Sequence, residues 1–509
     1  MKSASVPEYV LDILSQLEGA RFEAYLVGGC VRDLIMGREP YDWDVATNAR
    51  PEEIQVVFPN SVYENEFGTV GVKVATSDKR HETSNIVEIT TYRKEEAYTD
   101  KRHPDAISFA KTIEEDLARR DFTVNAMALG IRNQESGIRN KEVNSLFIIP
   151  NSSFQITDLF DGQSDIKNKI IRAVGNPEDR FNEDALRLMR AVRFAAQLGF
   201  SIEDRTKTAV RAQAHLLKMI AHERIRDELI KLVESDDPEK GIFLMQELGL
   251  LKIVLPELEE GVGVTQNLHH IYTVFDHSVK SLGFAAYYKF NVYVRLASLL
   301  HDVAKPRTKA GEGTNATFYN HEYVGAKMAA RALERLRFPK DFIEKVARLI
   351  RYHMFYYNVG EVTARSVRRL LRKVGPENIQ ELLQVRQAER KGSGVPKAEP
   401  YKLRHLKYMI EKVSRDPLTV GMLKVNGDDV MQALGIEPGP KVGYILNALL
   451  EEVIDEPELN SREYLLKRMQ ELNQLSESEL IKLAAAGKDK LEEEKEKEDE
   501  GIKEKYYVR

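Results

Sequence analysis

Residues 25–47, YLVGGCVRDLIMGREPYDWDVAT, constrain this chain more than any other stretch of its sequence. A short apolar run of strand type ends at Gly28-Gly29, helical composition follows, and the stretch closes on Asp42 and Asp44. Residues two apart in an extended segment point the same way, so both carboxylates face one point in space. Two such charges repel by roughly 4 kcal/mol at an effective dielectric of about 20, and a divalent cation such as Mg²⁺ removes that repulsion.

The glycine pair belongs to the same chemistry. Glycine lets backbone N–H groups approach a phosphate, and a helix that begins there points its positive end at the site. A phosphate cradle followed by a metal-binding acid pair is what nucleotidyl transfer needs. A surface turn with two solvated aspartates explains an Asp-x-Asp alone more often, but it does not explain the whole stretch.

Composition excludes several classes of protein. A chain of 509 residues is too long for one core and predicts three or more domains. Its net charge of −5 excludes a bulk electrostatic nucleic-acid binder, so such contacts must come from local basic patches. A single cysteine, Cys30, excludes a disulfide framework, and no apolar run is long enough to span a membrane. We expect a cytoplasmic protein.

The hydrophobic pattern changes once along the chain. Residues 68–76 and 85–93 alternate as strands, which suggests an antiparallel sheet beside the acid pair. Residues 131–157 are polar and irregular, and from about residue 176 nearly everything has helical periodicity. The predicted fold class is α+β, with a sheet-containing first domain followed by helical ones. The expected domains are 1–150, 151–260, 261–395, 396–475 and a charged segment, 476–509, that is a solvated single helix or disordered.

Two groups could complete the site at the acid pair. Glu88, between apolar neighbours on a predicted antiparallel strand, is a candidate third carboxylate, although an ordinary edge glutamate explains it equally well. In RRDFTVNA, arginine forks suit a triphosphate and a carboxylate can accept hydrogen bonds from ribose hydroxyls. The candidates there are Arg120, Asp121 and Asn125, and a helix end with a salt bridge is the alternative.

Glu183, Asp184 and Arg187 are expected to share one face of a helix. Cytosine and adenine each present an amino donor beside a ring-nitrogen acceptor, whereas guanine and uracil present the reverse order. An Asp184–Arg187 pair could therefore select CTP and ATP without a template, at about 1–3 kcal/mol per mismatched contact pair. An ordinary surface salt bridge is the commoner explanation for these residues alone.

Histidines and one aspartate recur after apolar runs farther along the chain. His277, His301, Asp302, His321 and His353 have the types and spacing that can converge on a metal. A core histidine remains the alternative for any one of them.

Basic character concentrates in residues 364–375, ARSVRRLLRKVG, which could follow a phosphate backbone or form a solvated face. The basic residues there are Arg365, Arg368, Arg369, Arg372 and Lys373. A Gly-Pro-Gly-Pro turn opens a later helix at Lys441, whose N-terminus could hold an RNA phosphate, with a plain helix connection equally possible.

From about residue 20 to 470 these motifs resemble, in order, the class II tRNA nucleotidyltransferase and bacterial poly(A) polymerase family, within the DNA polymerase β-like superfamily. LVGGCVRDLIMG…DWDVAT resembles its catalytic motif, RRDFTVNAMAL its ribose motif and RFNEDALRLMRAVRFAAQLGF its base-selecting motif. The resemblance implies a nucleotidyltransferase head with a small mixed or antiparallel sheet, then an all-α neck, body and tail that hold tRNA. It also implies Mg²⁺-dependent addition of C, C and A from CTP and ATP by two-metal transfer.

The resemblance also implies roles for individual residues. Asp42 and Asp44 would bind the metals, Glu88 would assist, and Asp184 and Arg187 would contact the base, with Glu183 positioning Arg187. The nucleotide would otherwise be held by Gly28, Gly29, Arg32, Asp33, Arg120, Asp121 and Asn125, with Arg190 and Arg193 as further phosphate contacts.

Several functions within and beyond this family stay open. Residues 92–115 resemble the full-length flexible loop of enzymes that add the terminal A, which favours complete CCA addition over CC-only or A-only addition. A poly(A) polymerase ranks second, because its usual basic tail is absent. The histidine series resembles an HD metal-dependent phosphohydrolase domain with a second divalent metal, in which Glu389 stands at the position of the family's late aspartate. A phosphohydrolase with an inactive head and a catalytically dead RNA-binding protein also stay open.

Overall fold

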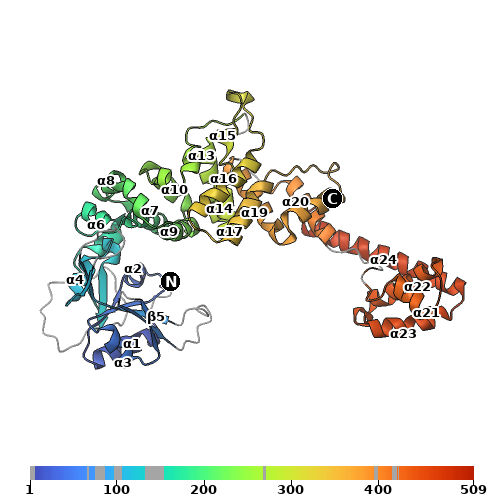
Figure 1. The fold of residues 1–509 in the computed structure, drawn as a ribbon, viewed down its shortest axis with the longest axis horizontal. Coiled ribbons are helices and arrows are strands. Elements are labelled where there is room, and N and C mark those ends of the chain that lie inside the picture. The colour runs from blue at the N-terminus through green and yellow to red at the C-terminus, as the bar shows by residue number, and fades with distance from the viewer. Residues whose placement is uncertain are drawn as a thin grey trace. The chain divides into compact units, whose positions relative to one another are not determined.

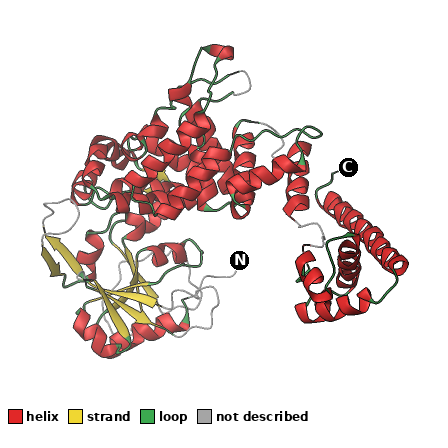
Figure 2. Ribbon diagram, turned by 45° about the vertical axis from the view of Figure 1, so that its right-hand side comes forward, coloured by secondary structure: helices red, strands yellow, loops and turns green. Residues whose placement is uncertain are grey.

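The computed structural model describes residues 6–65, 68–74, 86–96, 106–131, 154–267, 271–394, 399–414, 421 and 423–508. They form two compact units. The first comprises Met1–His353 with Gln384–Val395, and the second Met354–Leu383 with Pro396–Arg509. Strands gather in the N-terminal part of the chain and the rest is helical (Figure 2), so the α+β fold class is confirmed.

A seven-stranded mixed sheet, in the order β3-β4-β5-β2-β1-β8-β9, forms the head. Only β2 and β5 pair in parallel, and the other neighbours are antiparallel. The strands are β1 Ala24–Val27, β2 Asp44–Thr47, β3 Ser61–Asn65, β4 Thr69–Lys73, β5 Ile86–Thr91, β8 Met127–Ile131 and β9 Phe154–Asp158. The two strands predicted at 68–76 and 85–93 are β4 and β5, and they are antiparallel to each other as expected.

The helices of the head each bury one face against the rest of the unit. α1 (Glu8–Gly19) and α3 (Pro51–Val57) lie side by side (Figure 1), and α2 (Gly29–Ile35) packs on β1 and β8. α4 (Ile113–Ala118) follows a two-stranded ribbon, β6 (Arg93–Glu96) with β7 (Ala106–Phe109). The interpretation of 131–157 as irregular needs one correction, because residues 154–158 form the edge strand β9, and 132–153 lie outside the described residues.

Helices of the neck and body complete the first unit. α7 (Arg187–Leu198) is buried along most of its length and packs on α9 (His222–Glu234) and α10 (Pro238–Glu247). The other neck helices are α5 Gly162–Asn168, α6 Pro177–Glu183, α8 Asp204–Gln213, α11 Leu251–Val254 and α12 Pro256–Glu259. The body contains α13 Val274–Tyr287, α14 Val292–Leu300, α15 Lys305–Thr308, α16 His321–Arg335 and α17 Lys340–Tyr352.

The second unit has its own core between α21, α22, α23 and the start of α24. Its helices are α18 Ala364–Val374, α20 Tyr401–Ser414, α21 Gly427–Leu434, α22 Pro440–Asp455, α23 Arg462–Asn473 and α24 Glu477–Lys505, and α19 Ile379–Gly392 contributes to both units. Of the two alternatives for the charged end, a solvated single helix or disorder, the structure has the single helix, but that helix packs at both ends and is not solvated throughout. Leu480 and Ala484 are buried at its start, and Ile502 and Val508 pack on Tyr408 at its end, because apolar residues flank its charged middle.

No helix in the described part of the chain is long and apolar enough to cross a membrane.

Candidate active site

Gly28 forms the turn between β1 and α2, where a side chain does not fit. Its backbone has φ 75° and ψ −133°, a conformation that other residues rarely adopt. A Cβ atom there would lie 3.0 Å from Nη1 of Arg120 and 3.5 Å from Oδ2 of Asp44. The turn thus brings the backbone, a guanidinium and a carboxylate together, and the approach of a phosphate to these glycines stays a prediction.

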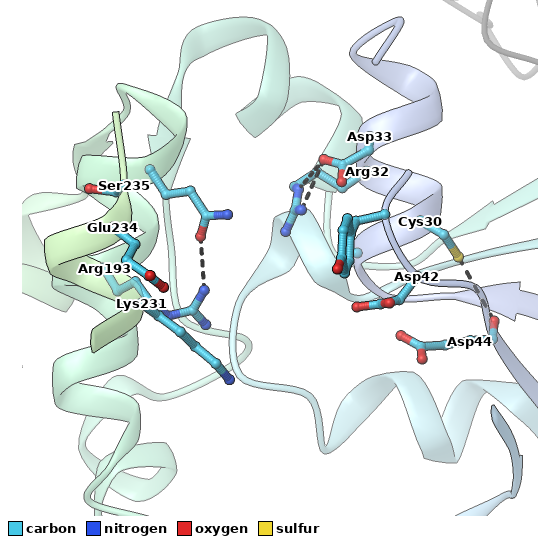
Figure 3. Close-up of a pocket in the computed structure, with 12 residues that line it drawn as sticks. Cys30, Arg32, Asp33, Asp42, Asp44, Arg193, Lys231, Glu234 and Ser235 are labelled. Carbon is cyan, nitrogen blue, oxygen red and sulfur yellow. Dashed lines mark hydrogen bonds and ion pairs between the residues drawn. The ribbon is translucent and has the colours of Figure 1, made fainter. Parts of the chain in front are cut away.

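Asp42 and Asp44 form the acid pair predicted from the sequence. Asp44 is the first residue of β2, Asp42 lies in the bend just before it, and Figure 3 shows their carboxylates side by side. Burial raises the pKa of Asp44; Arg120 opposes that shift, and the charge of Asp42 adds to it. Two neighbouring carboxylates, one exposed and one partly buried, suit a hard divalent cation.

Glu88 stands on β5 directly across from Asp44. We expected the strand of Glu88 to run antiparallel to its neighbour at the acid pair, but β5 runs parallel to β2. β2 and β5 are not joined as a hairpin, because β3 and β4 come between them in the chain and β5 pairs with β4 on its other side. Paired residues present their side chains on the same face, so the strand places Glu88 beside the acid pair in either direction.

Residues 119–121 connect the acid pair to the neck. Arg120 lies against Gly28 and is held by Asp116 at 3.1 Å. Burial would raise the pKa of Asp116, but Arg120 and Arg119 together lower it. Asp121, the third residue, accepts from Nε of Arg190 on α7 at 2.6 Å.

Arg32, Asp33 and Asn125 extend this connection to α2. Arg32 is buried and donates to Asp33 at 2.9 Å and to the side-chain oxygen of Asn125 at 2.8 Å. Asn125 in turn donates to Asp121 at 3.5 Å. Burial would raise the pKa of Asp121, but Arg190 and Arg187 lower it, so the carboxylate stays ionised at the centre of the network.

Glu183, Asp184 and Arg187 lie together but not in one helix. α6 ends at Glu183, Asp184 is extended at φ −137° and ψ 104°, and α7 begins at Arg187. The Asp184 carboxylate accepts from the N–H of Leu186 at 3.0 Å, a local bond that competes with helix formation. The expectation of one continuous helix was therefore wrong, whereas the bond from Arg187 to Glu183, at 2.6 Å, matches the expected positioning.

Asp184 is paired with an arginine that the motifs did not indicate. Arg224 on α9 donates to both of its carboxylate oxygens, at 3.3 and 2.7 Å. Arg187 donates to the backbone oxygen of Arg119 at 3.1 Å, directly beside Arg120. Arg119 and Arg120 thus connect Arg187, a candidate base-recognition residue, to the acid pair.

A cavity of about 440 Å³ separates the head from the neck helices. Asp33, Asp42 and Asp44 lie on one side of it, and Arg193 and Lys231 on the other (Figure 3). Sequence analysis missed Gln197, Lys231, Glu234 and Ser235 in this lining, because single residues on amphipathic helices carry no motif. The cavity is also lined by Gly29, Cys30, Arg32 and Tyr41.

Arg190 and Arg193 are bound to carboxylates of the protein. Arg193 donates to Glu228 at 2.6 Å, and both side chains are buried. Arg190 lies 3.8 Å from the other oxygen of Glu228 and also binds Asp121. Burial lowers the pKa of Arg193 despite Glu228. These arginines hold α7, α9 and the head together, and Arg193 also faces the cavity.

The predicted histidine series converges on Asp302 in the body. Oδ2 of Asp302 lies 3.4 Å from Nε2 of His277 and 3.1 Å from Nε2 of His301. Oδ1 lies 3.4 Å from Nε2 of His321 and 4.0 Å from Nε2 of His353. These residues form two buried triads, His277–His301–Asp302 and Asp302–His321–His353, which share Asp302. Imidazole nitrogens and a carboxylate are a donor set that suits a transition metal.

Backbone carbonyls fix the orientation of three of these rings. Nδ1 of His301, His321 and His353 lies 2.7–2.8 Å from the carbonyl oxygen three residues earlier. A carbonyl only accepts, so Nδ1 carries the proton and Nε2 keeps a lone pair. This arrangement is the one that metal-ligating histidines use. Burial lowers the pKa of His277 to about 3 and of His353 to about 4.

Glu389 does not join either triad in the described structure. Its carboxylate accepts from Nη1 of Arg386 at 2.5 and 2.6 Å. Burial would raise the pKa of Glu389, but Arg386 and then His353 lower it to about 2. The longer glutamate side chain is paired with a cationic neighbour here, and its place in the ligand set implied by the resemblance stays a prediction.

The predicted RNA-contacting residues lie in the second unit. Arg368, Arg369, Arg372 and Lys373 are exposed on α18, and the side chain of Arg365 lies outside the described residues. α22 begins at Pro440, and Lys441 donates to the carbonyl of Asn473 at 3.4 Å, so it joins α22 to the end of α23.

Three family models match the chain. They are the poly A polymerase head domain over residues 24–172, a probable RNA- and SrmB-binding site of polymerase A over 199–261, and the HD domain over 274–390.

Similar proteins are described as CCA-adding enzymes. A CCA-adding enzyme of Ligilactobacillus salivarius is 33% identical over 91% of this chain and 96% of its own length. One from Lactococcus lactis is 42% identical over 51% of this chain and 60% of its own length. The solved Bacillus stearothermophilus CCA-adding enzyme in complex with CTP is 28% identical, covers 92% of this chain and 97% of that one, and has a TM-score of 0.54.

Proposed function

The chain belongs to the family of CCA-adding enzymes, and we propose that it adds C, C and A to the 3′ end of tRNA, using CTP and ATP and no template. The observation that carries the proposal is the connection made by residues 119–121. Arg120 lies at Gly28 and Asp44, while its neighbours bind Arg187 and Arg190 of α7. The residues proposed to recognise the base are thus connected through residues 119–121 to the residues proposed to bind the metal.

Asp42 and Asp44 are proposed to hold Mg²⁺, with Glu88 beside them on the neighbouring strand. When bound there, the cations would lower the pKa of the attacking tRNA 3′-hydroxyl and neutralise charge on the leaving pyrophosphate. Gly28, Gly29 and Arg120 supply backbone N–H groups and a guanidinium for the triphosphate. The two neighbouring carboxylates fit that ion, because partial burial and the charge of Asp42 both raise the pKa of Asp44 and a cation would offset both.

Base choice is proposed to lie with Asp184 and Arg187. The carboxylate accepts from the amino group of cytosine or adenine, and the guanidinium donates to the neighbouring ring nitrogen. Uracil and guanine would place a carbonyl oxygen at the carboxylate and an N–H at the guanidinium, so both contacts become repulsive. The bond from Glu183 fixes Arg187 for this task.

Incubation with tRNA lacking its 3′ CCA, with CTP and ATP singly and together, tests the proposal. Growth by three nucleotides only when both are present supports CCA addition. A long ladder with ATP alone would identify a poly(A) polymerase, and a stop after two cytidines or addition of A alone would identify a partial enzyme. The loop that bears on this choice falls partly outside the described residues, at 97–105.

The tRNA is proposed to contact the exposed arginines of α18 and the helices that follow in the second unit. We place the activity in the cytoplasm, which the single, buried and unpaired Cys30 favours.

A second function is supported by the histidine cluster. We infer that the body also contains a metal-dependent phosphohydrolase centre built on Asp302, because four Nε2 atoms face its two oxygens. Native protein, purified without chelator, would contain a bound transition metal by mass spectrometry. Hydrolysis of a 2′,3′-cyclic phosphate that requires this metal supports the function, and a metal-free protein with no hydrolysis on metal addition would refute it.

A further inference from the structure

Tyr41 is an exposed aromatic residue in the cavity beside the acid pair. It is 75% exposed and lines the cavity together with Asp42 and Asp44. Pro40 and Trp43 on either side are buried, so the bend that carries Tyr41 is anchored at both of its ends. Among the described residues that line the cavity, Tyr41 is the one aromatic side chain. A large ring kept in an exposed place by buried neighbours is typical of a binding surface rather than of core packing.

We propose that the ring of Tyr41 stacks on the base of the 3′-terminal nucleoside of the tRNA, whose hydroxyl attacks the incoming nucleotide. This inference rests on the proposed function. Tyr41 directly precedes Asp42, one of the two acids proposed to hold the metal that acts on that hydroxyl. A ring one residue from this acid is in position to hold the terminal nucleoside beside it.

The base of the incoming nucleotide is assigned to another place. Asp184 and Arg187, which are proposed to recognise that base, are not among the described residues that line this cavity. Arg32 and Asp33, on the triphosphate side, do line it. The cavity volume is about 440 Å³, within the roughly 300–1,000 Å³ that is usual for ligand pockets. It therefore offers the second reactant, the RNA end, space beside the acid pair.

Stacking suits this position because the terminal base changes during the reaction. The RNA end presents first the last base of the shortened tRNA, then C, and then C again as nucleotides are added. A hydrogen-bonding side chain would have to match a different pattern of donors and acceptors at the first step. Every base has a π face, so an aromatic ring can hold each successive end.

The opposite side of the cavity offers positive charge for the RNA backbone. Arg193 and Lys231 lie across the cavity from the acids (Figure 3). The side chain of Lys231 is 59% exposed and lies 4.0 Å from Glu228, whose carboxylate is bound more closely by Arg193, at 2.6 Å. An exposed ammonium group there suits a phosphate of the RNA backbone. A ring on one side and cations on the other are the combination that binds single-stranded nucleic acid.

The test combines a change in the protein with a change in the RNA. Tyr41→Ala and Tyr41→Leu remove the ring, and the substrate is tRNA lacking its CCA, with the 3′-terminal nucleotide either intact or abasic. The control Tyr319→Ala removes a tyrosine that is 78% exposed and lies outside the cavity lining. The measurements are kcat/KM for the RNA at saturating CTP, KM for CTP at saturating RNA, and the melting temperature.

For Tyr41→Ala we expect kcat/KM for the intact RNA to fall about tenfold, as the loss of one contact between a base and an aromatic ring predicts. KM for CTP should change little. On the abasic RNA, the wild type and Tyr41→Ala should have equal kcat/KM, because no base remains to stack. Tyr41→Leu keeps apolar bulk without a π face and should lie between them on the intact RNA. Tyr319→Ala should match the wild type on both RNAs.

Equal kcat/KM for the wild type and Tyr41→Ala on the intact RNA would overturn the proposal. A fall of the same size on the intact and the abasic RNA would also overturn it, because the ring would then act on something other than the terminal base. A raised KM for CTP with unchanged kcat/KM for the RNA would assign the ring to the incoming nucleotide instead. If Tyr41→Ala does not fold, the comparison of Tyr41→Leu on the two RNAs decides. A wild-type protein that adds neither C nor A refutes the proposed function itself, which is a different result from any of these.

Discussion

Glu88 lies directly across from Asp44 in the parallel pairing of β5 with β2, the one parallel pair in the seven-stranded sheet. On its other side Glu88 faces Gly71 of β4, where no side chain takes up space. The strand register therefore places Glu88 on the same face of the sheet as Asp44. This position gives Glu88 a stronger case than its sequence alone did, since an edge glutamate would have only one neighbouring strand.

Replacing Glu88 with glutamine should lower kcat for nucleotide addition by about 10–100-fold, the usual effect of a carboxylate that supports a metal site. The amide keeps the shape and removes the charge, so the Mg²⁺ concentration for half-maximal activity should rise as well. Thr90→Ser, two residues along the same face of β5, serves as the control. Wild-type Mg²⁺ dependence in Glu88→Gln would show that the residue is an ordinary strand glutamate.

Replacing Gly28 with alanine should abolish most nucleotide addition, because the new Cβ would meet Arg120 at 3.0 Å and strain the turn. Gly37→Ala isolates the two causes. Gly37 also has a positive φ, 66°, but a Cβ there meets nothing within 4 Å. Both variants should lose about 1–2 kcal/mol of stability from the backbone alone, as denaturant unfolding would measure. Only Gly28→Ala should lose activity, and equal activity in the two would show that the close approach at Gly28 has no part in catalysis.

Glu228→Gln should destabilise the protein by about 3–5 kcal/mol, because it leaves Arg193 buried without its charge partner. Thermal unfolding would measure the loss. Glu247→Gln removes an exposed partner of Lys207 and Arg211, and it should cost no more than about 1 kcal/mol. Equal melting temperatures for Glu228→Gln and Glu247→Gln would show that the Arg193–Glu228 pair is not what joins α7 to α9.

His353→Ala should weaken binding of a transition metal by about tenfold or more, because it removes one Nε2 aimed at Asp302. Metal content after dialysis against a fixed free-metal concentration provides the measurement, and it does not depend on any enzymatic assay. His215→Ala changes an exposed histidine outside the cluster and should bind as the wild type does. Equal metal content in both variants would mean that the cluster is a packed histidine core.

What the sequence predicted well is local in the chain. The acid pair, the glycine turn and the Glu183–Arg187 bond each depend on residues within a few positions of one another, so spacing alone determines their geometry. The four histidines are separated farther. His301 and His353 follow apolar runs that end α14 and α17, whereas His277 and His321 lie in the first turns of α13 and α16.

What the sequence did not predict depends on long-range packing. Arg224 lies 40 residues from Asp184, and one arginine in an amphipathic helix has no pattern that names its partner. The helix break at Asp184 was missed because helical periodicity continues on both sides of it. Glu389 was assigned by analogy with an aspartate, and its extra methylene group allows it to reach Arg386 instead.

Asp499 is one of the residues that attach the C-terminal end of α24 to α20. Its carboxylate accepts from the hydroxyl of Tyr408 at 2.6 Å and binds Lys412 at 2.6 Å and Lys503 at 2.9 Å. Burial would raise the pKa of Asp499, but the hydrogen bonds from Lys412 and Tyr408 lower it to about 2. Asp499→Asn should therefore weaken this attachment by about 0.5–1 kcal/mol, since the groups are partly exposed to solvent.

Hydrogen exchange of the backbone amides of residues 501–508 would measure that loss, and Glu500→Gln, an exposed neighbour, should exchange as the wild type does. The pH dependence has a definite sign. The folded pKa is depressed, so the stabilisation by Asp499 is present above its ordinary value near 4 and is lost as the pH falls toward 2. The difference between the wild type and Asp499→Asn should be constant at neutral pH and shrink below pH 4. Identical exchange at neutral pH would show that the apolar packing of Ile502 and Val508 and the bonds to Glu411 hold the helix end without Asp499.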